Sequence, residues 1–116
     1  MNIIKIYFDS WKNQDLNIIK IFDENSIYKV KPFGEEEYTG LSQIIEYWKK
    51  NPMAQSQPNP KILECFSDQE KHKYFCEFEN QFMVDNKIKI TRGFILFEIN
   101  NGIISELSEF YKSKYL

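Results

Sequence analysis

The spacing of apolar residues along the chain changes from a helical period to a strand period about halfway. Apolar side chains recur every three or four residues in the segments 2–13, 16–22 and 41–50, which predicts three amphipathic helices. Asp15 lies where an N-cap would accept backbone N–H groups of the second helix, and the third helix is expected to end before Pro52. A short strand is predicted over 26–31, followed by a solvated loop through Pro32, Gly34 and the acidic run 35–37.

Beyond residue 60 the period is two, which predicts four long strands over 61–67, 73–84, 87–99 and 103–112. Short polar turns join them at 68–70, 85–86 and 100–102, so the strands form an antiparallel meander. In the segment 73–84 one face is apolar and the other is polar, as in a sheet with one solvated side. Asn80 falls on the apolar face, where a buried amide needs hydrogen-bond partners.

The composition narrows the class of protein. A chain of 116 residues predicts a single domain spanning 1–116, and aromatic residues at 16 % predict a dense core or an aromatic-lined cavity. A net charge of −2 without a long basic run argues against a nucleic-acid partner. Apolar runs are far shorter than the roughly 20 residues that cross a bilayer, so we expect no membrane partner and a soluble, cytoplasmic protein.

The cysteines and the single histidine carry little chemistry in the sequence. Cys65 and Cys76 fall on strands predicted to pair, where they could face each other, and we expect them to be free buried thiols. Together with one histidine they make neither a disulfide framework nor a zinc-ligand set. His72 falls in a turn, and the carboxylates lack metal-ligand spacing, so we predict no metal and no cofactor.

Four local patterns, taken in order, resemble the NTF2-like superfamily, and within it the SnoaL-like and ketosteroid-isomerase-like proteins. They are 7–16 (YFDSWKNQDL), 32–34 (PFG) with 38–40 (YTG), 44–48 (IIEYW) and 101–110 (NGIISELSEF). The resemblance implies an α+β cone in which three N-terminal helices pack on a strongly curved antiparallel sheet and enclose a mostly apolar pocket. It also implies a homodimer formed through the outer face of the sheet.

The catalytic pattern of the isomerases in this superfamily is only partly present. Tyr7 matches the tyrosine that stabilises the oxyanion, but the position of the general base is Lys31. The second, acidic oxyanion donor would fall at Phe94 or Ile95. Steroid-type isomerisation by the usual residues is therefore not expected, and whether the protein is an enzyme stays open.

Glu109 is the leading candidate for a functional carboxylate. Alternation along the last strand puts Leu107, Glu109 and Tyr111 on one face, which the resemblance makes the pocket face. The alternative is that Glu109 is the structural partner of Arg92, which interrupts an apolar set on the neighbouring strand. Unpaired in a dry pocket, Glu109 would have a raised pKa and could act with Tyr7 as an acid or base.

Aromatic residues supply the remaining candidate ligand contacts. Tyr7, Trp11 and Trp48 could stack on a flat ligand or could simply belong to the core, and the resemblance places Tyr28, Phe33 and Tyr38 at the pocket entrance. The predicted ligand-binding set is Trp11, Tyr28, Phe33, Tyr38, Trp48, Asn80, Arg92, Leu107 and Tyr111. Three functions follow: a domain that binds a small apolar or aromatic molecule, a proton-transfer enzyme of the isomerase, cyclase or hydrolase type, or a structural interaction module.

Overall fold

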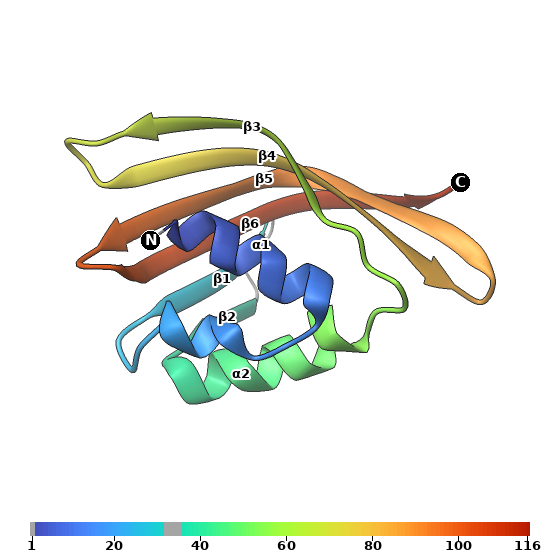
Figure 1. The fold of residues 1–116 in the computed structure, drawn as a ribbon, viewed down its shortest axis with the longest axis horizontal. Coiled ribbons are helices and arrows are strands. Elements are labelled where there is room, and N and C mark those ends of the chain that lie inside the picture. Colours follow the sequence, from blue (N-terminus) through green and yellow to red (C-terminus); the bar gives the residue numbers. More distant parts are fainter. Residues whose placement is uncertain (1, 32–35) are drawn as a thin grey trace.

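Helices cover one face of a single six-stranded sheet (Figure 1). The computed structural model describes residues 2–31 and 36–116, and no side-chain environment is described for Lys31. The two α-helices are α1 (Ile3–Asn13) and α2 (Leu41–Lys50), and two 3-10 helices are η1 (Asn17–Lys20) and η2 (Pro52–Ala54). The strands are β1 (Ile27–Lys31), β2 (Glu36–Thr39), β3 (Lys61–Asp68), β4 (Lys73–Val84), β5 (Lys87–Asn100) and β6 (Ile103–Tyr115).

The sheet has the order β2-β1-β6-β5-β4-β3 and is mixed. β3 to β6 form the predicted antiparallel meander, whereas β1 pairs with β6 in parallel, with Ile27 opposite Glu106. The expectation of a strongly curved antiparallel sheet is wrong, because the sheet is not strongly curled (Figure 1) and contains one parallel pair. The parallel pairing joins segments some 80 residues apart in the chain, so no local pattern could indicate it.

The helical part also differs from the prediction of three helices. The segment predicted as the second helix contains only the 3-10 helix η1, because the Asp15 side chain accepts the Asn17 backbone N–H and makes a tight local turn. Ile18, Ile21 and Phe22 are nevertheless buried, so their apolar spacing reflects the core and not an α-helix. Part of the predicted acidic loop is instead the strand β2. Its side chains are largely exposed, and it forms by backbone pairing with β1, so the solvated sequence did not reveal it.

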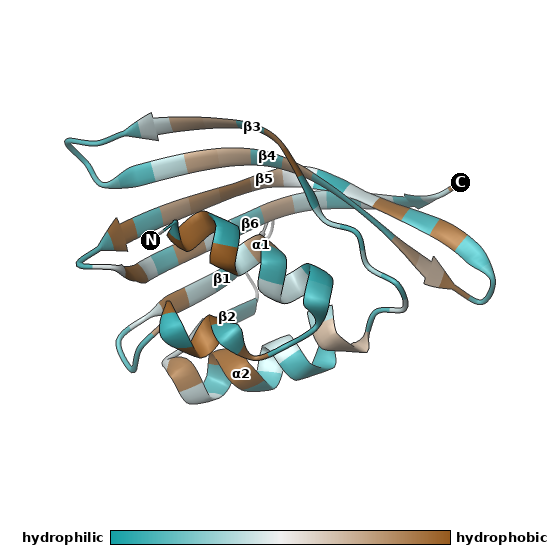
Figure 2. Ribbon diagram, viewed as in Figure 1, coloured by the Kyte–Doolittle hydropathy of each residue, from teal (hydrophilic) through white to brown (hydrophobic). Residues whose placement is uncertain are grey.

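The buried core lies between α1, α2 and the inner face of the sheet. Figure 2 shows hydrophobic and hydrophilic residues alternating along the strands, as expected for a sheet with one covered face. The ring of Tyr7 lies 5.3 Å from Trp48 of α2 and 5.4 Å from Phe97 of β5, measured between ring centroids. Trp48 is fully buried, and its indole N–H donates to the Asp15 carbonyl at 3.0 Å. This aromatic packing fixes both helices against the sheet.

On β5 the structure reverses the face that the apolar pattern indicated. Ile95 and Phe97 are fully buried, whereas Arg92 and Phe94 are exposed. Apolar residues occupy both alternating sets of this strand, so a period of two cannot select the inner face. The inner face of β4 is the predicted one, with Cys76, Phe78 and Asn80 fully buried.

The prediction of free cysteines is wrong. Cys65 of β3 and Cys76 of β4 are directly opposite in the register, with Cα atoms 4.2 Å apart, and they form a disulfide. Counting cysteines could not reveal this bond because it depends on the hairpin register. The cytoplasmic location stays a prediction, and no helix among residues 2–31 and 36–116 is long and apolar enough to span a membrane.

Candidate functional site

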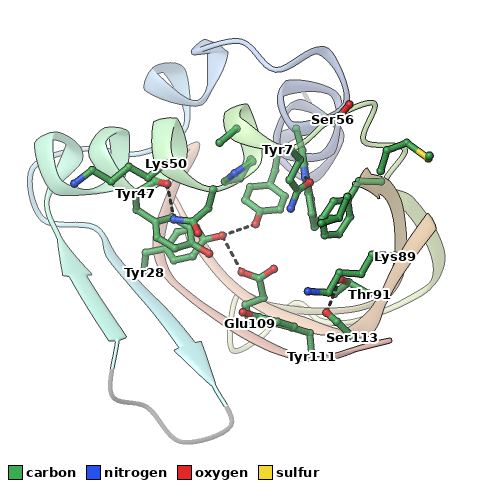
Figure 3. Close-up of a pocket in the computed structure, with 18 of the residues that line it drawn as sticks. Tyr7, Tyr28, Tyr47, Lys50, Ser56, Lys89, Thr91, Glu109, Tyr111 and Ser113 are labelled. Atoms are coloured by element: carbon green, nitrogen blue, oxygen red, sulfur yellow. Dashed lines mark hydrogen bonds between the residues drawn. The ribbon is translucent and has the colours of Figure 1, made fainter. Parts of the chain in front are cut away.

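A cavity of about 540 Å³ opens between the helices and the inner face of the sheet (Figure 3). Its walls come from α1, β1, α2, the connection after α2, the β4–β5 hairpin and β6. The aromatic lining residues are Tyr7, Trp11, Tyr28, Tyr47, Phe82 and Tyr111. Polar side chains, among them Gln55, Ser56, Thr91, Glu109 and Ser113, also line it, so the cavity is less apolar than the resemblance implied.

A chain of three hydrogen-bonded side chains forms one wall of this cavity. The Tyr28 hydroxyl donates to Glu109 Oε2 at 3.0 Å, and the Tyr7 and Tyr28 hydroxyl oxygens are 2.7 Å apart. Since the only hydroxyl proton of Tyr28 is directed to Glu109, Tyr7 is the donor to Tyr28. Figure 3 shows these three side chains converging from α1, β1 and β6. Tyr7 thus donates to Tyr28, and Tyr28 donates to the carboxylate of Glu109.

Burial shifts the ionisation of this group strongly. The Glu109 residue is only 5 % exposed, and desolvation raises its pKa from 4.5 to about 7, although the hydrogen bond from Tyr28 opposes the rise and Glu36 adds to it. Burial, followed by the charge of Glu109, raises the pKa of both Tyr7 and Tyr28 well above the usual value. The tyrosines therefore stay protonated while Glu109 exchanges its proton near neutral pH.

Arg92 is not the partner of Glu109, which rules out the structural alternative for that pair. Arg92 Nε donates to Glu79 Oε1 at 2.7 Å, and its side chain is 68 % exposed. Its prediction as a ligand contact is wrong for the same reason, because the reversed face of β5 turns it away from the helices. Among the described residues Glu109 makes no ion pair, and its side chain accepts a hydrogen bond from Tyr28.

The other predicted ligand contacts separate into two groups. Tyr7, Trp11, Tyr28 and Tyr111 line the cavity together with Glu109. Trp48 and Leu107 are fully buried in the core, Asn80 is fully buried in hydrogen bonds to Asn59 and Gln55, and the ring of Tyr38 packs on Tyr47 with centroids 4.7 Å apart. Phe33 lies outside the described residues. Trp48 therefore belongs to the core, which was the alternative interpretation of its helical spacing.

Sequence reasoning missed several lining residues. Tyr47 precedes Trp48 on α2 and carries no distinguishing pattern, yet its ring lies 5.0 Å from that of Tyr28. Gln55 belongs to the extended connection after α2, where neither period nor motif singles it out. Its Oε1 accepts hydrogen bonds from Trp11 Nε1 at 2.8 Å and from Asn80 Nδ2 at 3.0 Å. Only the tertiary fold brings this loop residue to the cavity.

Among the described residues no group of three or more His, Cys, Asp or Glu side chains could hold a metal ion. His72 lies in the β3–β4 turn, exposed and with a φ of 56°. Lys31 pairs through its backbone with Phe110 of β6. The described part of the cavity thus offers carboxyl groups (Glu109 and Asp85), the ammonium groups of Lys50 and Lys89, phenols, hydroxyls and amides.

Comparison with solved structures finds the same fold in enzymes and in proteins of unknown role. The epoxide hydrolase/cyclase-like enzyme SalBIII, which acts in pyran ring formation in the polyether salinomycin, matches with a TM-score of 0.84 at 16 % identity, over 98 % of this chain and 93 % of that one. A ketosteroid-isomerase-like protein from Catenulispora acidiphila, in complex with trimethylamine, matches with a TM-score of 0.79 at 13 % identity, over 96 % and 85 %. A candidate SnoaL-like polyketide cyclase from Shewanella putrefaciens gives 0.76 at 12 % identity, over 94 % and 86 %.

These similarities define the fold. A scan against protein-family models and a search of curated proteins each found no match. The chain has the NTF2-like fold of ketosteroid-isomerase-like and SnoaL-like proteins over nearly its whole length, which confirms the predicted resemblance. Because one fold of this kind hosts many activities, function must be argued from the cavity itself.

Proposed function

We propose that this protein binds a small, flat, largely apolar organic molecule in the cavity beneath α1 and α2. A volume of about 540 Å³ suits a small organic ligand, and six aromatic side chains offer surfaces for it. One structural neighbour was crystallised with trimethylamine, which supports the view that this fold admits small molecules.

We further propose that the protein is an enzyme in which Glu109 transfers a proton to or from the bound molecule. The observation that carries this role is a buried carboxyl group that lines the cavity, has no cationic partner among the described residues and has a pKa of about 7. A plain binding cavity would need no such group, and burying it has a free-energy cost. Neighbours described as an epoxide hydrolase and as cyclase-like support an enzyme.

The proton step needs only the residues of this chain. Ionised Glu109 removes a proton from a C–H or O–H bond of the substrate, and the electron pair of that bond stays on the substrate. The neutral acid then returns the proton to another atom, which leaves Glu109 ionised again. Tyr28 stabilises the carboxylate form through its hydrogen bond and so keeps both forms of Glu109 accessible near neutral pH.

The open cavity argues against a purely structural module. Such a protein would fill the space with its own aromatics, as Trp48 fills the core, but Trp11 leaves the cavity open.

A homodimer through the outer face of the sheet is a further proposal. Four phenylalanines are exposed across β3 to β6, and Phe75 and Phe94 stack with ring centroids 5.0 Å apart; the four are Phe66, Phe75, Phe94 and Phe110. An exposed apolar patch of this kind marks an interaction site. Alternation puts Glu77 of β4 and Lys112 of β6 on the same face, where Glu79 is already paired with Arg92. A two-fold axis near Phe94 would place the acidic strand of one copy over the basic strand of the other, which favours a second copy as the partner.

A screen of small ring-bearing molecules against the ¹⁵N-labelled protein tests the binding proposal. Hits should shift the amide signals of Tyr7, Trp11 and Tyr28, and hits whose structures rearrange by proton transfer should be converted by the wild-type protein. Glu109→Gln should abolish conversion while retaining binding. Hits that shift only exposed residues on the opposite face of the sheet would contradict the proposal.

A further inference from the structure

We propose that the side-chain amide of Gln55 is a second polar contact in the cavity, which donates a hydrogen bond to a carbonyl or similar acceptor oxygen of the ligand. The inference rests on the proposed function, since it assigns a chemical feature to the molecule that the cavity binds. It also identifies Gln55 as a residue that determines specificity, separate from the group that transfers the proton.

Three hydrogen bonds hold Gln55 in one orientation. Its backbone carbonyl accepts from Gln14 Nε2, and its side-chain Oε1 accepts from Trp11 Nε1 at 2.8 Å and from Asn80 Nδ2 at 3.0 Å. Asn80 is itself fixed, because it is fully buried and its Oδ1 accepts the Asn59 backbone N–H at 2.9 Å. Two donors on one oxygen define which end of the Gln55 amide is oxygen and which is nitrogen.

The nitrogen end of Gln55 is left available. No hydrogen bond from Gln55 Nε2 is found among the described residues, although the amide nitrogen carries two N–H donors. Among the described residues Ser10 Oγ is the one fully buried side-chain polar atom that lacks a partner, so Gln55 Nε2 is not fully buried. Because Gln55 lines the cavity, we infer that this nitrogen faces it. A donor fixed in advance costs little conformational entropy when a ligand binds.

The position of Gln55 relative to Glu109 limits the shape of the ligand. Tyr7, which belongs to the Glu109 hydrogen-bond chain, and Trp11, which holds Gln55, are one turn apart on α1. Their ring centroids are 6.5 Å apart. The two polar groups thus mark different positions along an aromatic wall, which fits a ring-bearing molecule with an acceptor oxygen away from its proton-transfer site.

A matched pair of probes, 1-indanone and indane, tests this inference because the two differ in one carbonyl oxygen. With ¹⁵N-labelled wild-type protein, 1-indanone should bind roughly three- to tenfold more tightly than indane, as one hydrogen bond provides. It should also shift the side-chain NH₂ signals of Gln55, which are assigned by their loss in Gln55→Glu. Indane should leave these NH₂ signals almost unmoved.

Gln55→Glu is the informative variant, because it keeps an oxygen for Trp11 and Asn80 and replaces the donor nitrogen by an acceptor. It should weaken 1-indanone about tenfold and leave indane unchanged. Gln57→Glu is the control, since it adds the same charge at an exposed position two residues away. Equal affinities for the two probes, or unmoved Gln55 NH₂ signals in the wild type while other cavity signals shift, would overturn the inference and leave the proposed function standing. A failure of both probes to shift any cavity signal would count against both proposals.

Discussion

Glu109 is unusual because its nearest polar partners are phenols. A buried carboxylate is normally matched by a cation or by several N–H donors, whereas Glu109 accepts a single hydrogen bond from Tyr28 among the described residues. The desolvation of the carboxylate therefore outweighs the stabilisation by Tyr28, and the pKa rises to about 7. The same balance lets Glu109 gain or lose a proton near neutral pH, as the proposed proton transfer requires.

Removing the Tyr28 hydroxyl should raise the pKa of Glu109 further. The hydrogen bond from Tyr28 favours the ionised carboxylate, so Tyr28→Phe should shift the Glu109 titration upward by about one unit. The measurement is the ¹³C chemical shift of the Glu109 carboxyl group as a function of pH. Tyr47→Phe is the matched control, because Tyr47 also lines the cavity but makes no hydrogen bond to Glu109. An unchanged or lower pKa in Tyr28→Phe would contradict the described hydrogen-bond chain.

The raised pKa also predicts how stability depends on pH. The pKa of Glu109 is higher in the folded protein, about 7, than its ordinary value of 4.5, so the folded state binds the extra proton between these values. Stability should therefore fall as pH rises from about 4.5 through 7, by at most about 3 kcal/mol. Glu109→Gln should remove this loss and be more stable than the wild type above pH 7.

Urea denaturation of both proteins across this pH range measures the effect. The exposed Glu70→Gln serves as the control and should follow the wild-type profile. Parallel profiles for the wild type and Glu109→Gln would show that Glu109 is not the group responsible. A large destabilisation of Glu109→Gln at every pH would mean that its charge is structurally required.

At the scale of elements, β5 and β6 approach closely at Gly93, the only residue of β5 without a side chain. A Cβ at this position would lie 1.8 Å from the Phe110 carbonyl oxygen and 2.7 Å from the Cα of Tyr111. The backbone of β6 cannot yield without moving Glu109, which lies two residues from Tyr111. Gly93 thus allows the strand pairing that presents the carboxyl group to the cavity.

Gly93→Ala should therefore destabilise the protein by about 3 kcal/mol or more, because the clash is with backbone and not with a movable side chain. Gly102→Ala is a useful comparison. Its φ of +76° strains an alanine, but a Cβ there meets nothing within 4 Å, so we expect a loss of about 1 kcal/mol. Equal losses for the two variants in chemical denaturation would contradict the close approach.

Helices and strands were predictable where one face alone is buried, and less so elsewhere. α1, α2 and β4 have a single apolar face, so their periods indicate both the element and its orientation. β5 is apolar on both alternating sets, and the orientation of Arg92 and Phe94 depends on packing that no local pattern encodes. The face of β6 was predicted from the alternation of Leu107, Glu109 and Tyr111 together with the family resemblance, although Ser108 between them is buried as well. This is why the carboxylate was found and its partner was not.

In the molecule as a whole, the inner face of the sheet encloses the cavity, and the outer face carries the proposed contact between two copies. Phe94→Gln, at the centre of the exposed phenylalanine row, should weaken the dimer tenfold or more, as loss of a central aromatic contact does. Ile19→Gln is the control, since Ile19 is an exposed apolar residue of η1. Sedimentation velocity over a concentration series measures the change, and a monomeric wild type at all concentrations would refute the dimer.

Titration of Glu109 in the wild-type protein, followed by carboxyl ¹³C NMR and assigned with Glu109→Gln, tests the proposed proton transfer at its source. We expect an apparent pKa of about 7, which corresponds to a buried carboxyl group that lines the cavity and has no ion-pair partner among the described residues. A value near 4.5 would mean that Glu109 is solvated or paired, and it would remove the basis for proton transfer in this cavity.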